Sequence, residues 1–289
     1  MVTLQILVLS FMVRVRVPQQ ETKLLAEAVW FFWFNHLAMM SMKHNHGFSF
    51  VLLPLMALAL LAGVLPVGAM PPVRLQKTSA WHAGAVVSAQ EVASMGLDQC
   101  FRSDPIPDNV FARMRGKSYP MGCRVSRASL RYVRLLHRDE DGKTRMGELV
   151  CNKQIAADVL RVFRQLYDEG YPIHSVRLID DFGADDERSM RANNTSCFCY
   201  REVKGSRKLS AHALGMAVDL NPLYNPYYRK HRNGKVTVQP ANALKYCDRN
   251  ARFPYKITRS DRAYRLFVSL GFQWGGAWRS VKDYQHFEK

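Results

Sequence analysis

The sequence predicts an α+β fold in which a small, mainly antiparallel sheet is flanked by helices. Helical and strand-like hydrophobic patterns are mixed along the chain without a regular β-α-β alternation, and no internal repeat is present. The composition, 48% hydrophobic and 22% charged over 289 residues, is typical of a globular protein and excludes a disordered chain or a collagen-like fibre. The length suits one catalytic-sized domain with accessory segments.

The N-terminal part of the chain contains a predicted export signal. Lys43 gives residues 42–69 a short positive start, and an apolar stretch over 48–61 leads to small residues at 67–69. We therefore expect an exported protein, periplasmic or associated with the cell envelope, with no stable membrane span once the signal is removed. A scaffold held in the membrane by an uncleaved segment is the alternative, because about 20 apolar residues can span a bilayer.

The composition of the chain also predicts where the catalytic domain begins. Residues 1–41 precede a complete signal that has its own methionine, Met42, and we interpret them as an upstream extension outside the fold. Residues 70–96 show little periodicity and predict a linker or irregular arm. The predicted catalytic domain then spans residues 97–289.

The first regular elements of that domain are a hairpin and a helix. Residues 130–137 and 146–151 predict two strands joined by a polar turn at 139–142. Apolar residues then recur at spacings of three and four over 155–166, which predicts a helix with Asn152 as its N-cap.

Shorter elements complete the prediction. Residues 175–182 and 214–220 read as strands, and a second amphipathic helix begins at 260–261. Gly271 ends this helix, and residues 272–274 predict a short strand.

Six cysteines follow the predicted signal. An even number of cysteines in an exported chain predicts disulfides, although the sequence does not determine their pairing. Cys197 and Cys199 lie too close in sequence to pair comfortably with each other. No Cys-x-x-Cys motif is present, which argues against a zinc knuckle.

The segment 210–219 contains the strongest local pattern, Ser-Ala-His-Ala-Leu-Gly-Met-Ala-Val-Asp. His212 and Asp219 could both bind a metal ion. They are seven residues apart, and residues an odd number apart on one strand point to opposite faces. His212 must therefore precede the strand that ends at Asp219, on a loop that Gly215 allows to turn back.

A second cluster lies near the C-terminus. A Trp-Gly-Gly segment begins at Trp274, and Asp283 is followed three residues later by His286. A helical turn would place these two side chains on one side. Two imidazoles and one carboxylate leave the fourth position of a tetrahedral zinc ion open, as in catalytic sites, and the ligand types suit zinc better than magnesium or calcium.

These two clusters, in this order, resemble the zinc D-Ala-D-Ala carboxypeptidase family, whose relatives include the vancomycin-resistance-type D,D-dipeptidases and the L-alanyl-D-glutamate endolysin peptidases. The resemblance covers roughly residues 150–289 and implies a Hedgehog- and DD-peptidase-like zinc site. It implies that His212, Asp219 and His286 hold Zn²⁺ and that Asp283 is the catalytic acid and base. The family also uses an arginine to hold the substrate carbonyl or carboxylate.

Several residues are candidates for the remaining roles. Arg201 and Arg191 are the candidate catalytic arginines, with Arg207 as a third possibility. Ser210, Trp274 and Trp278 are the candidate substrate-binding residues, with Tyr284 as a further possible wall of the cleft.

The predicted function is that of a zinc metallopeptidase of the bacterial envelope. Its expected partners are peptidoglycan stem or cross-link peptides, cut as a D-Ala-D-Ala carboxypeptidase or as an L-Ala-D-Glu or D,D-endopeptidase. The net charge of +17 is consistent with attraction to an anionic wall. Nucleic acid is not an expected partner, because the chain has an export signal and no groove-reading motif. A non-enzymatic wall-binding module on the same zinc scaffold is the alternative.

Overall fold

The computed structural model describes residues 2–8, 11–17, 81–203 and 208–289, which belong to two units, 1–74 and 75–289. In the first unit, β1 (Val2–Val8) pairs antiparallel with β2 (Phe11–Val17). The predicted signal at 42–69 lies outside the described residues. Within the described part of the chain, no helix has the length and apolar character needed to cross a membrane.

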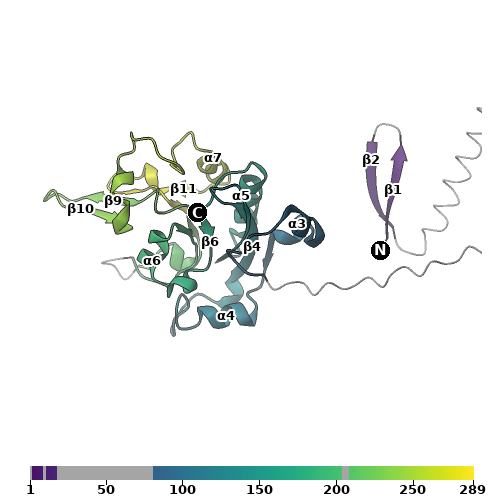
Figure 1. Cartoon of the computed structure of the whole chain (residues 1–289). Helices are drawn as coiled ribbons and strands as arrows, with labels where there is room; N and C mark the ends of the chain where they lie inside the picture. Colours follow the sequence, from purple (N-terminus) through teal and green to yellow (C-terminus); the bar gives the residue numbers. More distant parts are fainter. Residues whose placement is uncertain (1, 9–10, 18–80, 204–207) are drawn as a thin grey trace, which may run out of the picture. The chain divides into compact units, whose positions relative to one another are not determined.

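A long hairpin forms the centre of the second unit (Figure 1). Strand β4 (Leu130–Arg138) pairs antiparallel with β5 (Thr144–Asn152), with Leu130 opposite Asn152 and Arg138 opposite Thr144. Strand β3 (Arg102–Asp104) adds to the other edge of β4. The predicted hairpin is therefore confirmed, and each strand extends one or a few residues further than predicted.

Helix α5 (Ala156–Asp168) packs on β4 through the apolar face that the sequence predicts. The expected N-cap is wrong, because the cap position is Ile155 and no side chain caps the helix. Asn152 instead ends β5: its side chain accepts a hydrogen bond from the Gln154 backbone N–H and donates one to the Leu214 carbonyl.

The remaining sheets are small. Strand β8 (Ala217–Asp219) pairs with β13 (His286–Glu288), which also pairs with β11 (Gln273–Trp274). A second antiparallel sheet has the order β10 (Val236–Gln239), β9 (Tyr227–Lys230), β12 (Lys282–Asp283).

Two predicted strands are shorter than expected. The region 175–182 contains only β6 (Ser175–Val176), paired in parallel with β7 (Asn194–Thr195), and then a 3₁₀ turn at Ile179–Phe182. The region 214–220 contains only β8, because Gly215 has a positive φ of 69° that ends the preceding turn.

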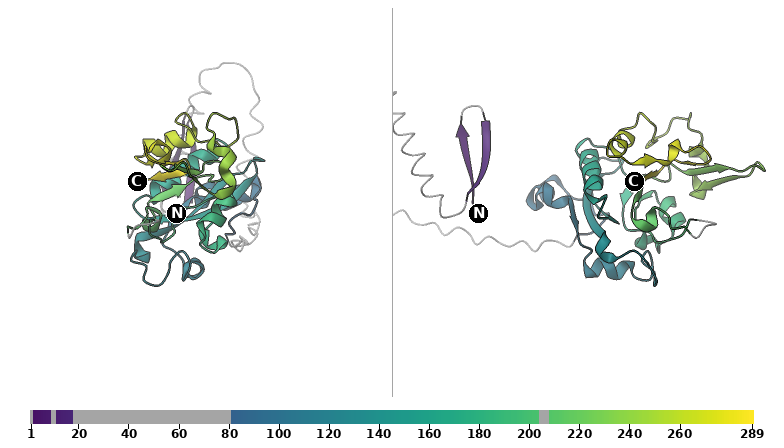
Figure 2. Two further views of the ribbon diagram at one scale, coloured as in Figure 1. Left: turned by 90° about the vertical axis from the view of Figure 1, so that its left-hand side faces the viewer. Right: turned by 180° about the vertical axis from the view of Figure 1, so that it is seen from behind.

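The β9–β10 hairpin projects from one edge of this unit (Figure 2), and four other described helices belong to the same unit. They are α3 (Ala89–Met95), α4 (Asp108–Met114), α6 (Asp186–Arg191) and α7 (Arg262–Ser269). Helix α7 agrees with the prediction, and the Asp261 side chain caps it by accepting hydrogen bonds from the Ala263 and Tyr264 backbones. The mixture of short antiparallel sheets and helices confirms the α+β class.

The interpretation of residues 70–96 as an irregular arm needs correction over 81–96. Ser88 and Glu91 form a capping box that begins α3, a signal visible in the sequence. Backbone hydrogen bonds from Gly84 and Val87 to β5 hold the segment against the hairpin. Val87 and Val92 are buried there in an apolar cluster.

The expectation of disulfides is also corrected, since all six cysteines are free. Cys151 and Cys197 belong to the main apolar core, which also contains side chains of β4, α5, α7 and β13. Burial raises the pKa of the Cys151 thiol to about 12 and that of Cys197 well above its usual value. Both side chains therefore pack as neutral apolar groups.

Candidate active site

Three candidate metal ligands converge from separate parts of the chain. His212 lies in a 3₁₀ turn (His212–Leu214), Asp219 ends β8 and His286 begins β13. The β8–β13 register places His286 directly opposite Asp219, so two ligands are cross-strand neighbours. Gly215 brings in the third, because its left-handed conformation turns the chain from His212 back into β8.

The space around Gly215 explains why no larger residue fits there. A Cβ atom at this position would lie 2.7 Å from the backbone nitrogen of Asn152, at the end of β5. The turn that carries His212 therefore packs backbone against backbone on the central hairpin. The rigid hairpin positions the first ligand.

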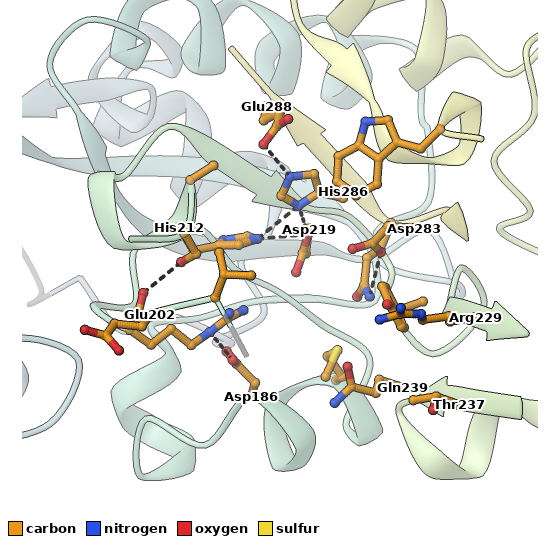
Figure 3. A pocket seen from close by; sticks show the side chains of 18 of the residues that line it. Asp186, Glu202, His212, Asp219, Arg229, Thr237, Gln239, Asp283, His286 and Glu288 are labelled. Carbon is orange, nitrogen blue, oxygen red and sulfur yellow. Dashed lines mark hydrogen bonds and ion pairs between the residues drawn. The ribbon is translucent and has the colours of Figure 1, made fainter. Parts of the chain in front are cut away.

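The three ligand atoms form a nearly equilateral triangle (Figure 3). The distance from His212 Nε2 to His286 Nδ1 is 3.1 Å, and Asp219 Oδ1 lies 3.2 Å from the former and 3.0 Å from the latter. Ligands at zinc bond lengths of about 2.0–2.1 Å in a tetrahedron are separated by about 3.3 Å. The triangle therefore fits one tetrahedral zinc ion.

Hydrogen bonds fix the orientation of both imidazoles. His212 Nδ1 lies 2.6 Å from the Cys197 carbonyl oxygen, and His286 Nε2 lies 3.1 Å from Glu288 Oε2. Each ring thus donates its N–H to an oxygen and turns its other nitrogen toward Asp219. Such outer hydrogen bonds typically orient metal-binding histidines. Glu288 was not predicted, although a spacing of two in a strand places it on the same face as His286.

The electrostatics of the trio favour a cation. Burial acts to raise the pKa of Asp219, but the two imidazoles outweigh it and hold that pKa well below its usual value. Burial acts to lower the pKa of His286, but hydrogen bonds to Asp219 and Glu288 outweigh it and raise that pKa. Positive charge is thus stabilised among these side chains, either as a proton or as a metal ion that replaces it.

Asp283 lies beside the trio, at the end of β12 (Figure 3). Burial and the nearby Asp219 carboxylate raise the pKa of Asp283 to about 6. Gln285, which was not predicted, donates a hydrogen bond of 3.2 Å from Nε2 to Asp283 Oδ1. The expected helical turn at 283–286 is wrong, because β12 and β13 are two strands joined by a tight connection.

The Trp-Gly-Gly segment supports this connection. A Cβ atom at Gly275 would lie 2.7 Å from the Asp283 carbonyl oxygen and 3.3 Å from the His286 Cβ. At Gly276 it would collide with the ring of Trp274. The two glycines therefore let this segment pack directly beneath Asp283 and His286.

The trio and Asp283 line one pocket of about 730 Å³. The other lining residues come from α6, from 201–203 and 210–211, from the β9–β10 hairpin and from the C-terminal segment 278–288. Both a metal ion and several residues of a peptide can be accommodated in this volume.

The candidate arginines differ in position. Arg201 lines the pocket and forms an ion pair with Asp186 of α6. Arg191 does not line it, and its guanidinium pairs with Glu187 on the same helix at 2.9 Å. Arg207 lies outside the described residues.

The candidate substrate-binding residues also differ in whether they line the pocket. Trp278 lines the pocket, with its ring centroid 5.3 Å from that of His286. Trp274 does not line it: its ring is buried in the main core and its Nε1 donates to the Tyr284 carbonyl. Ser210 also lines the pocket. Tyr284 is not among the described residues that line it.

The Ser210 hydroxyl serves the loop around His212. Its oxygen accepts a hydrogen bond from the Ala213 backbone and donates one to the Arg201 carbonyl. Both contacts are internal to the segment that positions His212. The structure therefore gives Ser210 a supporting place in the ligand loop.

Residues 204–289 match a family model described as D-alanyl-D-alanine carboxypeptidase. The matched segment contains His212, Asp219, Asp283 and His286. Comparisons with curated proteins and with solved structures give no match. The resemblance seen in the sequence is thus confirmed over this segment. Peptidases of this family depend on zinc, and zinc is the ion that the buried His-Asp-His group fits.

Proposed function

We propose that the protein is an exported zinc peptidase of the bacterial envelope that hydrolyses peptide bonds in the stem or cross-link peptides of peptidoglycan. The observation that carries the proposal is the convergence of His212, Asp219 and His286 on one point, with the carboxyl group of Asp283 beside it in the same pocket. The family match supports the peptidase class and this class of substrate. Export is supported by the signal-like segment at 42–69 and the net charge of +17.

Zinc bound by the trio supplies a Lewis acid that polarises a carbonyl group and makes water more acidic. Glu288 and the Cys197 carbonyl hold the two imidazoles in the orientation that binding requires. The negative charge of Asp219 partly balances the cation. These residues keep the ion at a fixed place in the pocket.

Asp283 moves the proton in this proposal. Its carboxylate accepts a proton from the attacking water and later delivers it to the departing amine, as a general base and then a general acid. A pKa near 6 suits both roles, because the group releases and regains a proton near neutral pH. Gln285 holds one carboxylate oxygen and leaves the other available for proton transfer.

Arg201 is the arginine that we place beside the substrate carbonyl. It lines the pocket, and the Asp186 carboxylate fixes its guanidinium. A fixed donor that meets the developing oxyanion contributes about 10²–10³-fold to the rate. Arg191 is set aside for this role because it pairs with Glu187 away from the pocket lining.

Replacing Asp283 by Asn tests the proposal. We expect the zinc-loaded wild-type protein to release peptides from purified peptidoglycan, identified by mass spectrometry, and the variant to be slower by about 10²–10⁴-fold. The variant should retain one zinc per chain, because Asp283 is outside the trio.

The pH profile sharpens the same test. Because the base must be ionised, the wild-type rate should fall about tenfold per pH unit below a pKa near 6. Zinc content measured at each pH separates this effect from loss of the ion. Peptide release by Asp283→Asn at the wild-type rate would contradict the mechanism. Zinc-dependent binding of peptidoglycan without any cleavage would instead favour the wall-binding module.

A further inference from the structure

One face of the β9–β10 hairpin forms a wall of the pocket. Successive residues of a strand point to opposite faces, and the lining residues follow this period of two. They are Tyr227, Arg229, His231, Thr237 and Gln239. The register places Thr237 opposite Arg229 and Gln239 opposite Tyr227, so they form one surface.

This wall is joined to the strand that carries Asp283. Strand β12 pairs with β9, with Asp283 opposite Tyr227. Arg229 is two residues further along β9, or about 7 Å at the rise of a strand. In Figure 3, Arg229 lies on the same side of the pocket as Asp283, and Asp186 and Glu202 lie on the other side.

Arg229 is exposed, and its side chain has no ion pair or hydrogen bond among the described residues. The other arginine among the described lining residues, Arg201, is already paired with Asp186. The sequence around Arg229 has no competing acid either, since residues 222–247 contain no Asp or Glu. They do contain five cations: Arg229, Lys230, Arg232, Lys235 and Lys245.

We propose that Arg229 is a substrate-binding residue that holds a carboxylate of the bound peptide, an assignment that rests on the proposed peptidase function. A guanidinium binds a carboxylate through two parallel hydrogen bonds, which gives both strength and orientation. The separation along β9 between Tyr227 and Arg229 is comparable to two extended residues of substrate, about 7 Å. A peptide cut beside Asp283 can therefore place a carboxylate one or two residues away against Arg229.

Two kinds of carboxylate in a stem peptide have the required chemistry: the one at the C-terminus and those carried by acidic residues within the peptide. Recognition of the C-terminal group would make the enzyme a carboxypeptidase, because only a chain end is then accepted. Recognition of an internal group would allow cleavage within the chain. The same subsite thus determines which bond is cut.

The test measures binding by calorimetry, which requires no turnover. The zinc-loaded protein is titrated with a stem-type peptide that ends in D-alanyl-D-alanine, made in two forms with a non-hydrolysable phosphinate either at the C-terminal bond or at the bond before the internal acidic residue. The form that the wild type binds more tightly is used in all comparisons. A second peptide is amidated at the C-terminus, a third at its internal carboxylates, and a fourth at both. Arg229→Gln is compared with Arg229→Lys and with Arg232→Gln, a control on the same hairpin that does not line the pocket.

We expect Arg229→Gln to raise the Kd of the free peptide by about 10- to 100-fold, the range for a charge-assisted pair. Arg229→Lys should recover part of this loss, and Arg232→Gln should change the Kd less than about twofold. The fully amidated peptide should bind the wild type and Arg229→Gln equally. The single amidation that abolishes the difference between the two proteins identifies the carboxylate.

Three results would overturn the subsite: equal losses for Arg229→Gln and Arg232→Gln, an equal loss for the free and the fully amidated peptide, or no binding by the wild type. Zinc content shows whether a variant has kept its active site. Cleavage of peptidoglycan by the wild type, with no selective effect of Arg229→Gln, would refute the subsite and leave the peptidase function standing. Selective binding without cleavage of the matching natural peptide would refute the peptidase function and leave the subsite standing.

Discussion

The central hairpin with α5 and the segment that holds the metal trio are built in different ways. In the first region, two nine-residue strands and a thirteen-residue helix bury mainly apolar side chains, and the buried polar ones are His137, Thr144 and Glu148. In the second, the strands have two to four residues, and many buried side chains are polar. The buried polar side chains of this second region are Asn193, Asn194, Thr195, Ser196, Ser210, His212, Asp219, Asn221, Asn225, Gln285 and His286.

The two regions contribute differently, because the first mainly stabilises the fold and the second mainly fixes the geometry of the site. Apolar burial is not directional, so the hairpin and α5 supply stability and tolerate small shifts. Buried polar groups must keep their partners, because an unpaired one costs about 1–3 kcal/mol. The hydrogen bonds of Asn221, Asn225 and Asn194 with nearby backbone groups therefore fix the short strands in place. Substitutions in the hairpin and α5 should therefore change mainly the free energy of unfolding, and substitutions around the metal trio should change mainly the peptidase rate.

The largest effect on stability is expected from Phe163→Ala in α5. Phe163 is 1% exposed and lies in the main core, so its removal leaves a cavity. We expect the free energy of unfolding to fall by about 3–5 kcal/mol in a urea titration. The fraction of variant that remains folded should still bind one zinc per chain. A loss below about 1 kcal/mol would show that the core does not carry the stability.

The same substitution, Gly to Ala, can be made in both regions. At Gly275 the added Cβ would lie 2.8 Å from the Asp283 Cβ, and neither backbone can move without shifting the site. A displacement of about 1 Å in a catalytic group costs on the order of 100-fold in rate. We therefore expect Gly275→Ala to lower the peptidase rate by about that factor while it keeps most of its stability.

Gly147→Ala in β5 is the matched control. There the added Cβ would lie 2.7 Å from Leu135 Cδ1, the end of a flexible side chain in the core. Overpacking of this kind typically costs about 1–3 kcal/mol of stability. The rate per folded molecule should be unchanged. If Gly275→Ala and Gly147→Ala lowered this rate equally, the distinction between the two regions would fail.

The two regions also differ in what the sequence could predict. Long elements have enough periodic positions to be recognised, which is why the hairpin, α5 and α7 were predicted. Strands of two or three residues carry no period, so 175–182 and 214–220 were predicted too long. Asn152 looked like a helix cap because its side chain is short and polar, but its partners across the fold are invisible in sequence.

For the site, the sequence motifs predicted the three metal ligands that the structure brings together. Glu288, Gln285 and Arg229 were recognised only in the structure. Glu288 could have been found from its strand spacing to His286, but the segment was interpreted as a helical turn. Gln285 could not, because its role depends on a side chain that turns back to Asp283. Arg229 could not, because its place in the pocket depends on where β12 pairs with β9. Trp274 and Arg191 looked like site residues by position alone, and tertiary packing directs them elsewhere.

Zinc-edge anomalous diffraction from crystals of the zinc-loaded protein would locate the ion on which the proposed mechanism depends. We predict one strong anomalous peak at full occupancy, within about 2.0–2.2 Å of His212 Nε2, His286 Nδ1 and an Asp219 oxygen. A zinc-loaded crystal with no peak at this point, or with its peak bound to other side chains, would contradict the proposed zinc site.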